Sequence, residues 1–175
     1  MNPDGGVAFF DRQFQQQVQN RDFQLNPFEL TALPYLKGRV LDFGCGLGNL
    51  AIAAAQQGCS VVALDGSHPA IEHLRQRAAA ESLPVEAIEA DLRTHEIGED
   101  FDCVVSIGLL MFFDCATALR VLALLQAHVR PGGIAAINVL AEGTTYLDPL
   151  DLVADRRQQT GHGRREERCG RTTPS

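Results

Sequence analysis

The sequence predicts an α/β domain with a doubly wound, mostly parallel β-sheet and helices on both faces. Three observations predict this class. Short runs of β-branched and aliphatic residues alternate with helical patterns, a glycine-rich turn follows the first run, and the 175 residues with 45% apolar composition suffice for one buried core. Strand–helix–strand connections are right-handed, so strands that alternate with helices in this way form a parallel sheet.

Five apolar runs are predicted as strands because they are short, rich in β-branched residues and bounded by turn residues. They cover residues 39–43, 60–65, 85–91, 101–107 and 133–140. Helices are predicted between them at residues 50–57, 69–81 and 117–129. Ser67 is a good N-cap for the second helix, and Leu119, Leu122 and Leu125 are expected on one face of the third. The sequence RPGG at 130–133 is expected to stop that helix.

Residues 1–37 stand apart as a helical prefix that we expect to form a lid. Phe10, Phe14 and Val18 follow an i, i+4, i+8 spacing, which is typical of one helix face. In the sequence NPFE, Asn26 stands at an N-cap, proline at the first helical position and Glu29 where a capping box needs it.

The charges of the chain are unevenly distributed. Residues 1–154 hold 19 acidic residues against 9 Lys and Arg, a net charge of −10, whereas residues 155–175 hold 6 Arg against 3 acids, a net charge of +3. An acidic domain repels phosphate backbones, so we expect no nucleic-acid partner. There is no long apolar run and no signal-peptide pattern, so we expect no membrane span and a cytoplasmic location.

The cysteines and histidines do not predict a metal site. Five cysteines are widely spaced without a C-x-x-C pair, which indicates reduced thiols, and the five histidines are scattered. Cys45 lies inside the glycine turn, but no basic neighbour in the sequence would lower its pKa. We therefore interpret it as a small residue packed under the turn, not as a nucleophile.

The sequence VLDFGCGLGN at 40–49 places three glycines at alternate positions directly after the first strand. In parallel sheets ligands bind beyond the carboxyl ends of the strands, and glycines let the backbone approach a ligand closely. Acids end the first three strands. Asp42 suits a ligand amine, Asp65 suits two ribose hydroxyls, and Asp91 suits the amino group of an adenine.

Two cofactors fit this row of acids. The dinucleotide fingerprint G-x-G-x-x-G needs a third glycine where this chain has Asn49, so it fails by one residue. S-adenosylmethionine has no phosphate and carries a cationic sulfonium, so the compact G-x-G-x-G turn and the acidic domain suit it better. A nicotinamide cofactor remains an alternative, because Asp65 would serve its ribose equally well.

At residues 38–148 the chain resembles the class I S-adenosylmethionine-dependent methyltransferases, and within them the small tellurite-resistance-type enzymes. The matching stretches are GRVLDFGCGLGNLAIAAAQQGCSVVALD, EADL, FDCVVSIGLLMFF, VRPGG and AEGTTYLDP. The resemblance implies a Rossmann-like core over residues 38–151 that binds S-adenosylmethionine. It implies cofactor contacts by the following residues: Asp42, Gly44, Cys45, Gly46, Gly48, Asn49, Asp65, Gly66, Asp91, Leu92 and Ser106.

The acceptor is less well specified by the sequence. After the fourth strand the chain reads SIGLLMFF instead of an Asn-Pro-Pro-Tyr motif, which disfavours nucleobase and glutamine amino groups. We expect a small-molecule acceptor, and the resemblance suggests a soft nucleophile such as a thiol or a chalcogen oxyanion. The candidate substrate-binding residues are Asn26, Phe28, Met111 and Phe112, with Phe23 and Phe28 in the lid; no catalytic residue is assigned.

The end of the chain departs from the family pattern. Residues 152–175 have almost no apolar residue after Ala154 and no helical or strand period, so we expect a disordered basic tail, such as a truncation or a shifted reading frame would produce. We expect the last strands of the family sheet to be absent, which would leave the fifth strand at an edge where a second copy could pair. The alternative to a methyltransferase is then a cofactor-binding protein without activity, or less favourably a nicotinamide-dependent oxidoreductase.

Overall fold

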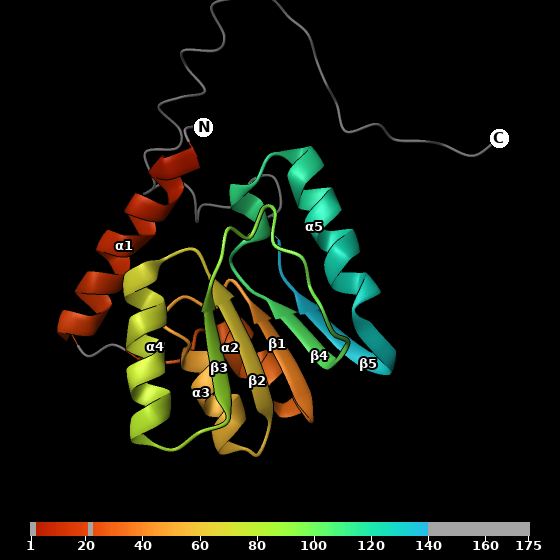
Figure 1. The fold of residues 1–175 in the computed structure, drawn as a ribbon, viewed down its shortest axis with the longest axis horizontal. Helices are drawn as coiled ribbons and strands as arrows, with labels where there is room; N and C mark the ends of the chain where they lie inside the picture. Colours follow the sequence, from red (N-terminus) through yellow and green to blue (C-terminus); the bar gives the residue numbers. More distant parts are fainter. Residues whose placement is uncertain (1–2, 21–22, 140–175) are drawn as a thin grey trace, which may run out of the picture. The chain divides into compact units, whose positions relative to one another are not determined.

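The computed structural model describes residues 3–20 and 23–139. Five strands form one sheet in the order β3-β2-β1-β4-β5, and each neighbouring pair is parallel (Figure 1). The strands are β1 (Arg39–Phe43), β2 (Ser60–Asp65), β3 (Val85–Glu89), β4 (Phe101–Ser106) and β5 (Val129–Ile137). The predicted parallel α/β sheet is therefore confirmed.

Helices cover both faces of the sheet. Helices α3 (Asn49–Gln56) and α4 (His68–Ala80) share one buried layer with Val40, whereas α5 (Cys115–Ala127) shares the other with Leu41. Successive residues of a strand point to opposite faces, so each strand contributes to both layers. This two-sided burial explains why the strands are nearly continuous apolar runs in the sequence.

The strand order creates a switch point between β1 and β4. The chain moves from β1 outward to β2 and β3, and then returns to pair β4 with the other side of β1. At such a point the connections that leave neighbouring strands diverge to opposite faces, which opens a crevice beyond the carboxyl ends. The glycine turn that follows β1 lies at this crevice.

The prefix forms two α-helices, α1 (Pro3–Asn20) and α2 (Pro27–Ala32), followed by the 3₁₀ helix η1 (Leu33–Tyr35). The predicted capping box of α2 is confirmed. Asn26 Oδ1 accepts the backbone N–H groups of Phe28 at 2.9 Å and Glu29 at 3.0 Å, and Glu29 Oε2 accepts the N–H of Asn26 at 2.7 Å. Helix α1 runs beside α4 (Figure 1).

One helix end and one helix face differ from the expectation, whereas one predicted helix start is confirmed. The predicted N-cap of α4 is confirmed, since Ser67 Oγ accepts the N–H of Ala70. Helix α5, however, ends at Ala127, and RPGG lies within β5. The register between β4 and β5 shifts between Phe101 and Cys103, so the sheet accommodates this segment at a bulge. On α5 Leu119 is 55% exposed, whereas Val121 and Leu125 are buried.

Some expectations concern residues that the structure does not describe. The basic tail at 152–175 and the missing last strands lie outside the described residues. Within these, β5 forms one edge of the sheet, and pairing with a second copy stays a prediction. Across 3–20 and 23–139, none of the helices combines the length and the apolarity that a bilayer crossing requires.

Candidate functional site

The glycine turn joins β1 to α3 in a compact path that only glycine accommodates. A side chain on Gly48, whose φ is +70°, would overlap the buried side chain of Leu74. A Cβ on Gly46, whose φ is +52°, would lie 3.0 Å from the ring of Phe14 in α1. The alternating glycines therefore serve close packing against α4 and α1, as well as the turn itself.

The turn is held by its own backbone N–H groups. Those of Gly44 and Cys45 both donate to the carbonyl of Leu64, at 2.8 and 2.9 Å, and that of Gly48 donates to the carbonyl of Cys45 at 2.9 Å. Because Leu64 lies in β2, these bonds tie the turn to the neighbouring strand. These hydrogen bonds fix the conformation of the turn, which forms one wall of the neighbouring cavity.

A cavity of about 780 Å³ lies beyond the carboxyl ends of the strands. Its walls come from the glycine turn, from the ends of β2 and β3, from the segment after β4 and from α1. Of the sequence-predicted site residues, the following line it: Gly44, Cys45, Gly46, Asn49, Asp65, Gly66, Asp91, Leu92, Asn26 and Phe112. This volume lies within the range of small-molecule and cofactor sites, roughly 300 to 1,000 Å³.

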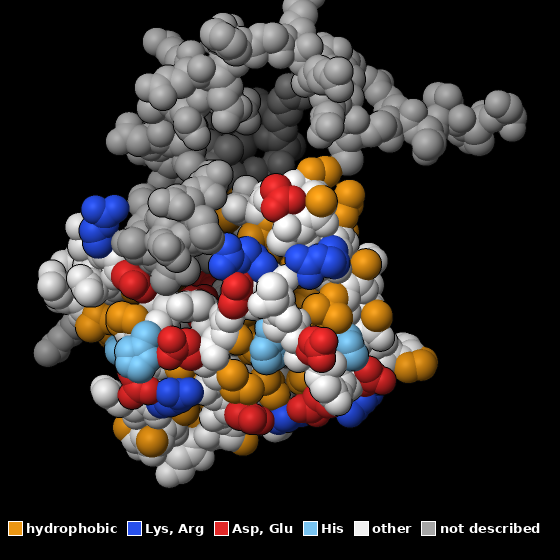
Figure 2. All heavy atoms as spheres, turned by 45° about the horizontal axis from the view of Figure 1, so that its top comes forward, with side chains coloured by type: hydrophobic (Ala, Val, Ile, Leu, Met, Phe, Trp, Pro, Cys, Tyr) orange, Lys and Arg blue, Asp and Glu red, His pale blue; other side chains and the backbone are white. Residues whose placement is uncertain are grey.

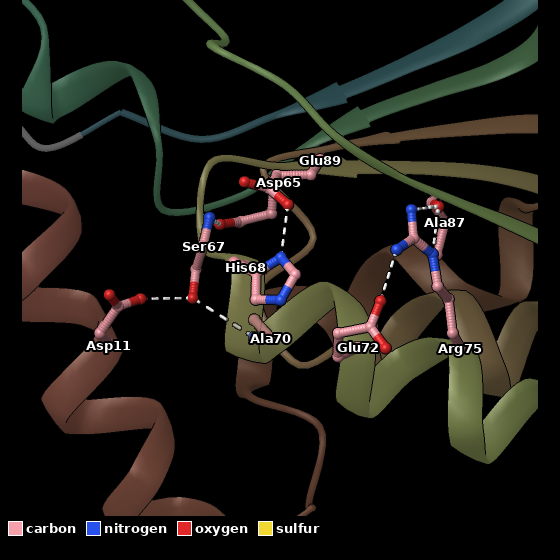
Figure 3. Close-up of polar contacts among 9 residues, drawn as sticks. All are labelled: Asp11, Asp65, Ser67, His68, Ala70, Glu72, Arg75, Ala87 and Glu89. Atoms are coloured by element: carbon pink, nitrogen blue, oxygen red, sulfur yellow. Dashed lines mark hydrogen bonds and ion pairs between the residues drawn. The ribbon is translucent and has the colours of Figure 1, made fainter.

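Asp65 connects the turn to the start of α4. Its Oδ2 accepts the N–H of Gly46 at 2.8 Å. Its Oδ1 accepts the N–H of Ser67 at 2.9 Å, and Figure 3 shows these two residues side by side. Burial raises the pKa of Asp65, and the hydrogen bonds from Ser67, Gly46 and Gly66 oppose the rise. Each carboxylate oxygen has a further lone pair, so Asp65 can still accept hydroxyl groups of a ligand.

Helix α1 is held to this corner by a polar contact. Asp11 accepts a hydrogen bond of 2.5 Å from the hydroxyl of Ser67, the N-cap of α4 (Figure 3). His68 beside it lies 2.6 Å from Glu89 at the end of β3, and this carboxylate raises the pKa of the His68 ring. The three elements α1, α4 and β3 therefore meet at one rim of the cavity.

Asp42 and Ser106 are buried polar residues at the ends of the adjacent strands β1 and β4. Asp42 is 5% exposed and Ser106 is fully buried. Burial, followed by the charges of Glu29 and Asp65, raises the pKa of Asp42 to about 8. Among the described residues, neither Asp42 Oδ2 nor Ser106 Oγ has a hydrogen-bond partner. Such orphaned groups are costly unless a ligand or water satisfies them.

Asp91 differs from the other two acids because a cation already pairs with it. Arg93 donates to it from its backbone N–H at 3.0 Å, from Nε at 2.8 Å and from Nη2 at 2.9 Å. These bonds lower the pKa of Asp91. A ligand amino group at this position would share the carboxylate with Arg93.

Other sequence-predicted residues lie away from the cavity wall. Phe28 is 57% exposed at the start of α2. Phe23 packs against His73 and Arg77 of α4. Met111, which belongs to the 3₁₀ helix η2 (Leu110–Phe112), does not belong to the lining, and neither do Gly48, Asp42 and Ser106.

Helix α1 contributes a part of the cavity wall that was not predicted from the sequence. Phe10, Gln13, Phe14 and Gln17 line the cavity, and Glu29 of α2 does so as well. The Phe10 ring stacks on Phe14 at 5.9 Å and meets Phe112 of η2 edge-on at 4.8 Å between centroids. The i, i+4 spacing of Phe10 and Phe14 indicated that both lie on one helix face, but it did not indicate which surface of the domain that face covers.

The charges around the cavity are mostly negative, whereas the face of the molecule in Figure 2 carries acidic and basic side chains interspersed.

Cys45 is buried, and burial together with Asp42 and Asp65 raises the pKa of its thiol well above the ordinary value. This thiol stays protonated and is a poor nucleophile. In the described part of the chain, no three His, Cys, Asp or Glu side chains are grouped to hold a metal ion.

Comparison with known proteins identifies the family. Residues 40–133 match the family described as "Methyltransferase domain". The chain belongs to this family. The resemblance to the class I S-adenosylmethionine-dependent methyltransferases is thereby confirmed, and with it the expected Rossmann-like strand order.

Several relatives of this methyltransferase domain have names that indicate different reactions. Carboxy-S-adenosyl-L-methionine synthase of Vibrio atlanticus (strain LGP32) is 32% identical over 73% of the chain and 56% of the relative. Malonyl-[acyl-carrier protein] O-methyltransferase of Salmonella typhimurium is 32% identical over 82% of the chain and 57% of the relative. Cypemycin N-terminal methyltransferase of a Streptomyces species is 37% identical over 59% and 42%.

Solved structures show the same fold. TehB from Haemophilus influenzae superposes with a TM-score of 0.60 at 22% identity, over 67% of this chain and 43% of that one. The DhpI–SAM–HEP complex gives a TM-score of 0.63 at 18% identity, over 85% and 70%. Our chain spans between 31% and 57% of the length of the curated relatives it matches.

Proposed function

We propose that this methyltransferase domain transfers the methyl group of S-adenosylmethionine to a small-molecule acceptor. One observation carries the proposal. The ends of β1, β2 and β3 bring the glycine turn, Asp65 and Asp91 to one cavity, in the order that an extended ligand with an amino acid end, a ribose and an adenine needs. The family of the chain uses such a ligand.

The orphaned groups at the strand ends fit this cofactor. Asp42 and Ser106 lie behind the cavity lining, so a shift of that lining or a bridging water would let Asp42 Oδ2 accept from the ammonium group of the methionine end and bring Ser106 near the sulfonium. Positive charge on the ligand would also relieve the repulsion among Asp42, Glu29 and Asp65. Asp65 with Gly66 would hold the ribose, and Asp91 would hold the adenine.

The internal hydrogen bonds of the turn disfavour a nicotinamide dinucleotide. A dinucleotide site offers free backbone N–H groups to a pyrophosphate. Here Gly44, Cys45 and Gly48 donate to carbonyl oxygens, and Gly46 donates to Asp65. The glycine turn would therefore give few donors to phosphate oxygens, whereas S-adenosylmethionine has none to satisfy.

The protein's part in methyl transfer would be to place the acceptor and exclude water. Bound S-adenosylmethionine supplies an already activated methyl group. Holding the acceptor in line with it can contribute about 7 to 11 kcal/mol to lowering the barrier. The rings of Phe10, Phe14 and Phe112 would pack against an apolar part of the acceptor, and we assign no general base.

The relatives support a small acceptor only in part, because their names include protein and carrier-bound substrates. A soft nucleophile such as a thiol or a chalcogen oxyanion fits the aromatic wall, since neither needs a strong base. An ordinary thiol has a pKa of about 8.5, so only its small thiolate fraction would react, but that fraction is nucleophilic enough to need no strong base in the site.

Calorimetry and turnover together test the proposal. We expect binding of S-adenosylmethionine and S-adenosylhomocysteine and no binding of NAD. With a labelled methyl donor and a panel of thiols, chalcogen oxyanions, amines and carboxylates, we expect label in a small product. Binding of the cofactor without any turnover would favour the alternative of a cofactor-binding protein, and binding of NAD alone would overturn the proposal.

A further inference from the structure

The Asn49 side chain lines the cavity at the first residue of α3, and its orientation is fixed by a neighbouring cation. Nη1 of Arg77, in α4, lies 2.7 Å from Asn49 Oδ1. A guanidinium group has only donors, so the atom that accepts from it must be the amide oxygen. The NH₂ group of Asn49 is therefore the part of the amide left for other partners.

Arg77 is itself held in place on its other side. Its guanidinium carbon lies 4.9 Å from the centroid of the Phe23 ring, and this ring stacks on His73 at 5.1 Å with an interplanar angle of 24°. Burial lowers the pKa of both His73 and Arg77, but an arginine stays charged in proteins. Phe23, His73 and Arg77 thus form a packed support behind the amide.

The charges around the cavity give this amide a specific use. Arg93 is the single basic residue among the described residues that line it, and it pairs with Asp91. The acidic residues of the lining are Glu29, Asp65, Glu89, Asp91 and Asp114. These acids repel the carboxylate of a zwitterionic ligand, so that carboxylate needs a donor placed away from them and next to a cation.

We propose that Arg77 is a positioning residue for the cofactor. It orients Asn49 so that the amide NH₂ binds the carboxylate of the methionine end of S-adenosylmethionine. This proposal rests on the proposed function, because it assigns the ammonium and the carboxylate of the methionine end to different parts of the same cavity. The ammonium group goes to the acids and the carboxylate goes to the Asn49 side of the turn, where the N-terminus of α3 also favours negative charge.

Calorimetry with two ligands tests this assignment. Decarboxylated S-adenosylmethionine keeps the adenosine, the sulfonium and the amine but lacks the carboxylate. In Asn49→Asp the contact with Arg77 is kept while the NH₂ donor is replaced by a negative charge. We expect this variant to bind S-adenosylmethionine about ten-fold more weakly or worse, and to bind the decarboxylated ligand at least as tightly as the wild type does, because that ligand has only cationic groups.

Variants at Arg77 separate positioning from structure. In Arg77→Met the amide is free to turn, so we expect a loss of several-fold for S-adenosylmethionine alone, and Arg77→Lys restores a donor and part of the affinity. Arg75→Met is the matched control: it removes a positive charge on the same helix, from a side chain that bonds Glu72 and the carbonyl of Ala87. We expect Arg75→Met to bind both ligands as the wild type does.

Each other outcome decides against the assignment. An equal loss for both ligands in Arg77→Met would mean that Arg77 only supports the fold, and unchanged affinity for S-adenosylmethionine in Asn49→Asp would place its carboxylate elsewhere. A wild-type chain that binds neither ligand would overturn the proposed function, and this assignment with it. Thermal unfolding of each variant without ligand shows whether a loss reflects folding.

Discussion

The two halves of the cavity are built in different ways. The strand-end half consists of the glycine turn with Asp65 and Asp91, and it is tied to the sheet by backbone hydrogen bonds. The aromatic half consists of Phe10, Phe14 and Phe112 on α1 and η2, and ring contacts hold its members together. The position of the strand-end half follows from the strand order of the sheet. The position of the aromatic half depends on how α1 packs on the domain. Predictions that affect one half and spare the other test this division.

The largest expected effect is on the fold, at the turn. Gly48→Ala forces a Cβ into Leu74 and imposes a positive φ of +70° on a residue that resists it. We expect a loss of about 3 kcal/mol or more in the free energy of unfolding, from overpacking and strain together. Urea denaturation measures it.

Gly58→Ala is the control for this substitution, because its φ is +95° but its Cβ would meet nothing within 4 Å. It should lose about 1 to 2 kcal/mol from strain alone. Equal losses in the two variants would mean that the turn is not tightly packed on α4.

The next effect is on cofactor binding, within the strand-end half. Asp65→Asn should lose charge-assisted hydrogen bonds to the ribose worth about 2 to 3 kcal/mol, because neither oxygen of Asp65 pairs with a cation in the described structure. Asp91→Asn should lose less, since Arg93 already shares that carboxylate. Calorimetry with S-adenosylmethionine ranks the two variants, and the reverse order would contradict the assignment of these acids.

Asp42 predicts a dependence of stability on pH. Its pKa rises from 3.8 in the unfolded chain to about 8 in the fold, so the folded state binds the proton more tightly. The stability that this group contributes is fully present below pH 3.8 and is lost as the pH rises toward 8. Between these pH values the free energy of unfolding falls by at most about 1.4 kcal/mol per pH unit because of this group.

Asp42→Asn keeps the shape and removes the titrating group. Urea midpoints from pH 5 to 8, without ligand, should therefore fall less steeply with pH in this variant than in the wild type. Parallel pH profiles would show that Asp42 is already ionised in the ligand-free protein.

The smallest effect is expected in the aromatic half. Phe10→Ala removes the ring that joins Phe14 to Phe112, and the loss of ring contacts should cost about 1 kcal/mol. We expect a higher KM for the acceptor with unchanged affinity for S-adenosylmethionine. Val18→Ala, at a position 37% exposed on the same helix, is the control and should change neither. A loss of cofactor affinity in Phe10→Ala would show that the two halves are not separate.

The division also explains which features could be predicted from the sequence. A buried parallel strand and a glycine turn are local patterns, and topology alone brings Asp42, Asp65 and Asp91 to strand ends. The contact of Arg77 with Asn49 joins residues 28 positions apart on two different helices, and no local pattern predicts such a contact.

The prefix illustrates the same limit. The capping box of Asn26 predicted where α2 begins, because it involves only neighbours in sequence. It did not predict that Phe28 would face solvent, or that Phe10 and Phe14 would line the cavity. On α5 the helix was predictable, but Leu119 was assigned to the wrong face because three leucines alone do not define which side the sheet covers.

The contact between Phe14 and Gly46 has a spectroscopic consequence. The chain contains no tryptophan and two tyrosines, so its intrinsic fluorescence is weak. An indole introduced by Phe14→Trp would be the sole strong emitter, and it would lie against the glycine turn at the wall of the cavity. Its emission would report changes in polarity at that wall as a ligand arrives, which would give a direct signal for stopped-flow mixing without labelled substrate.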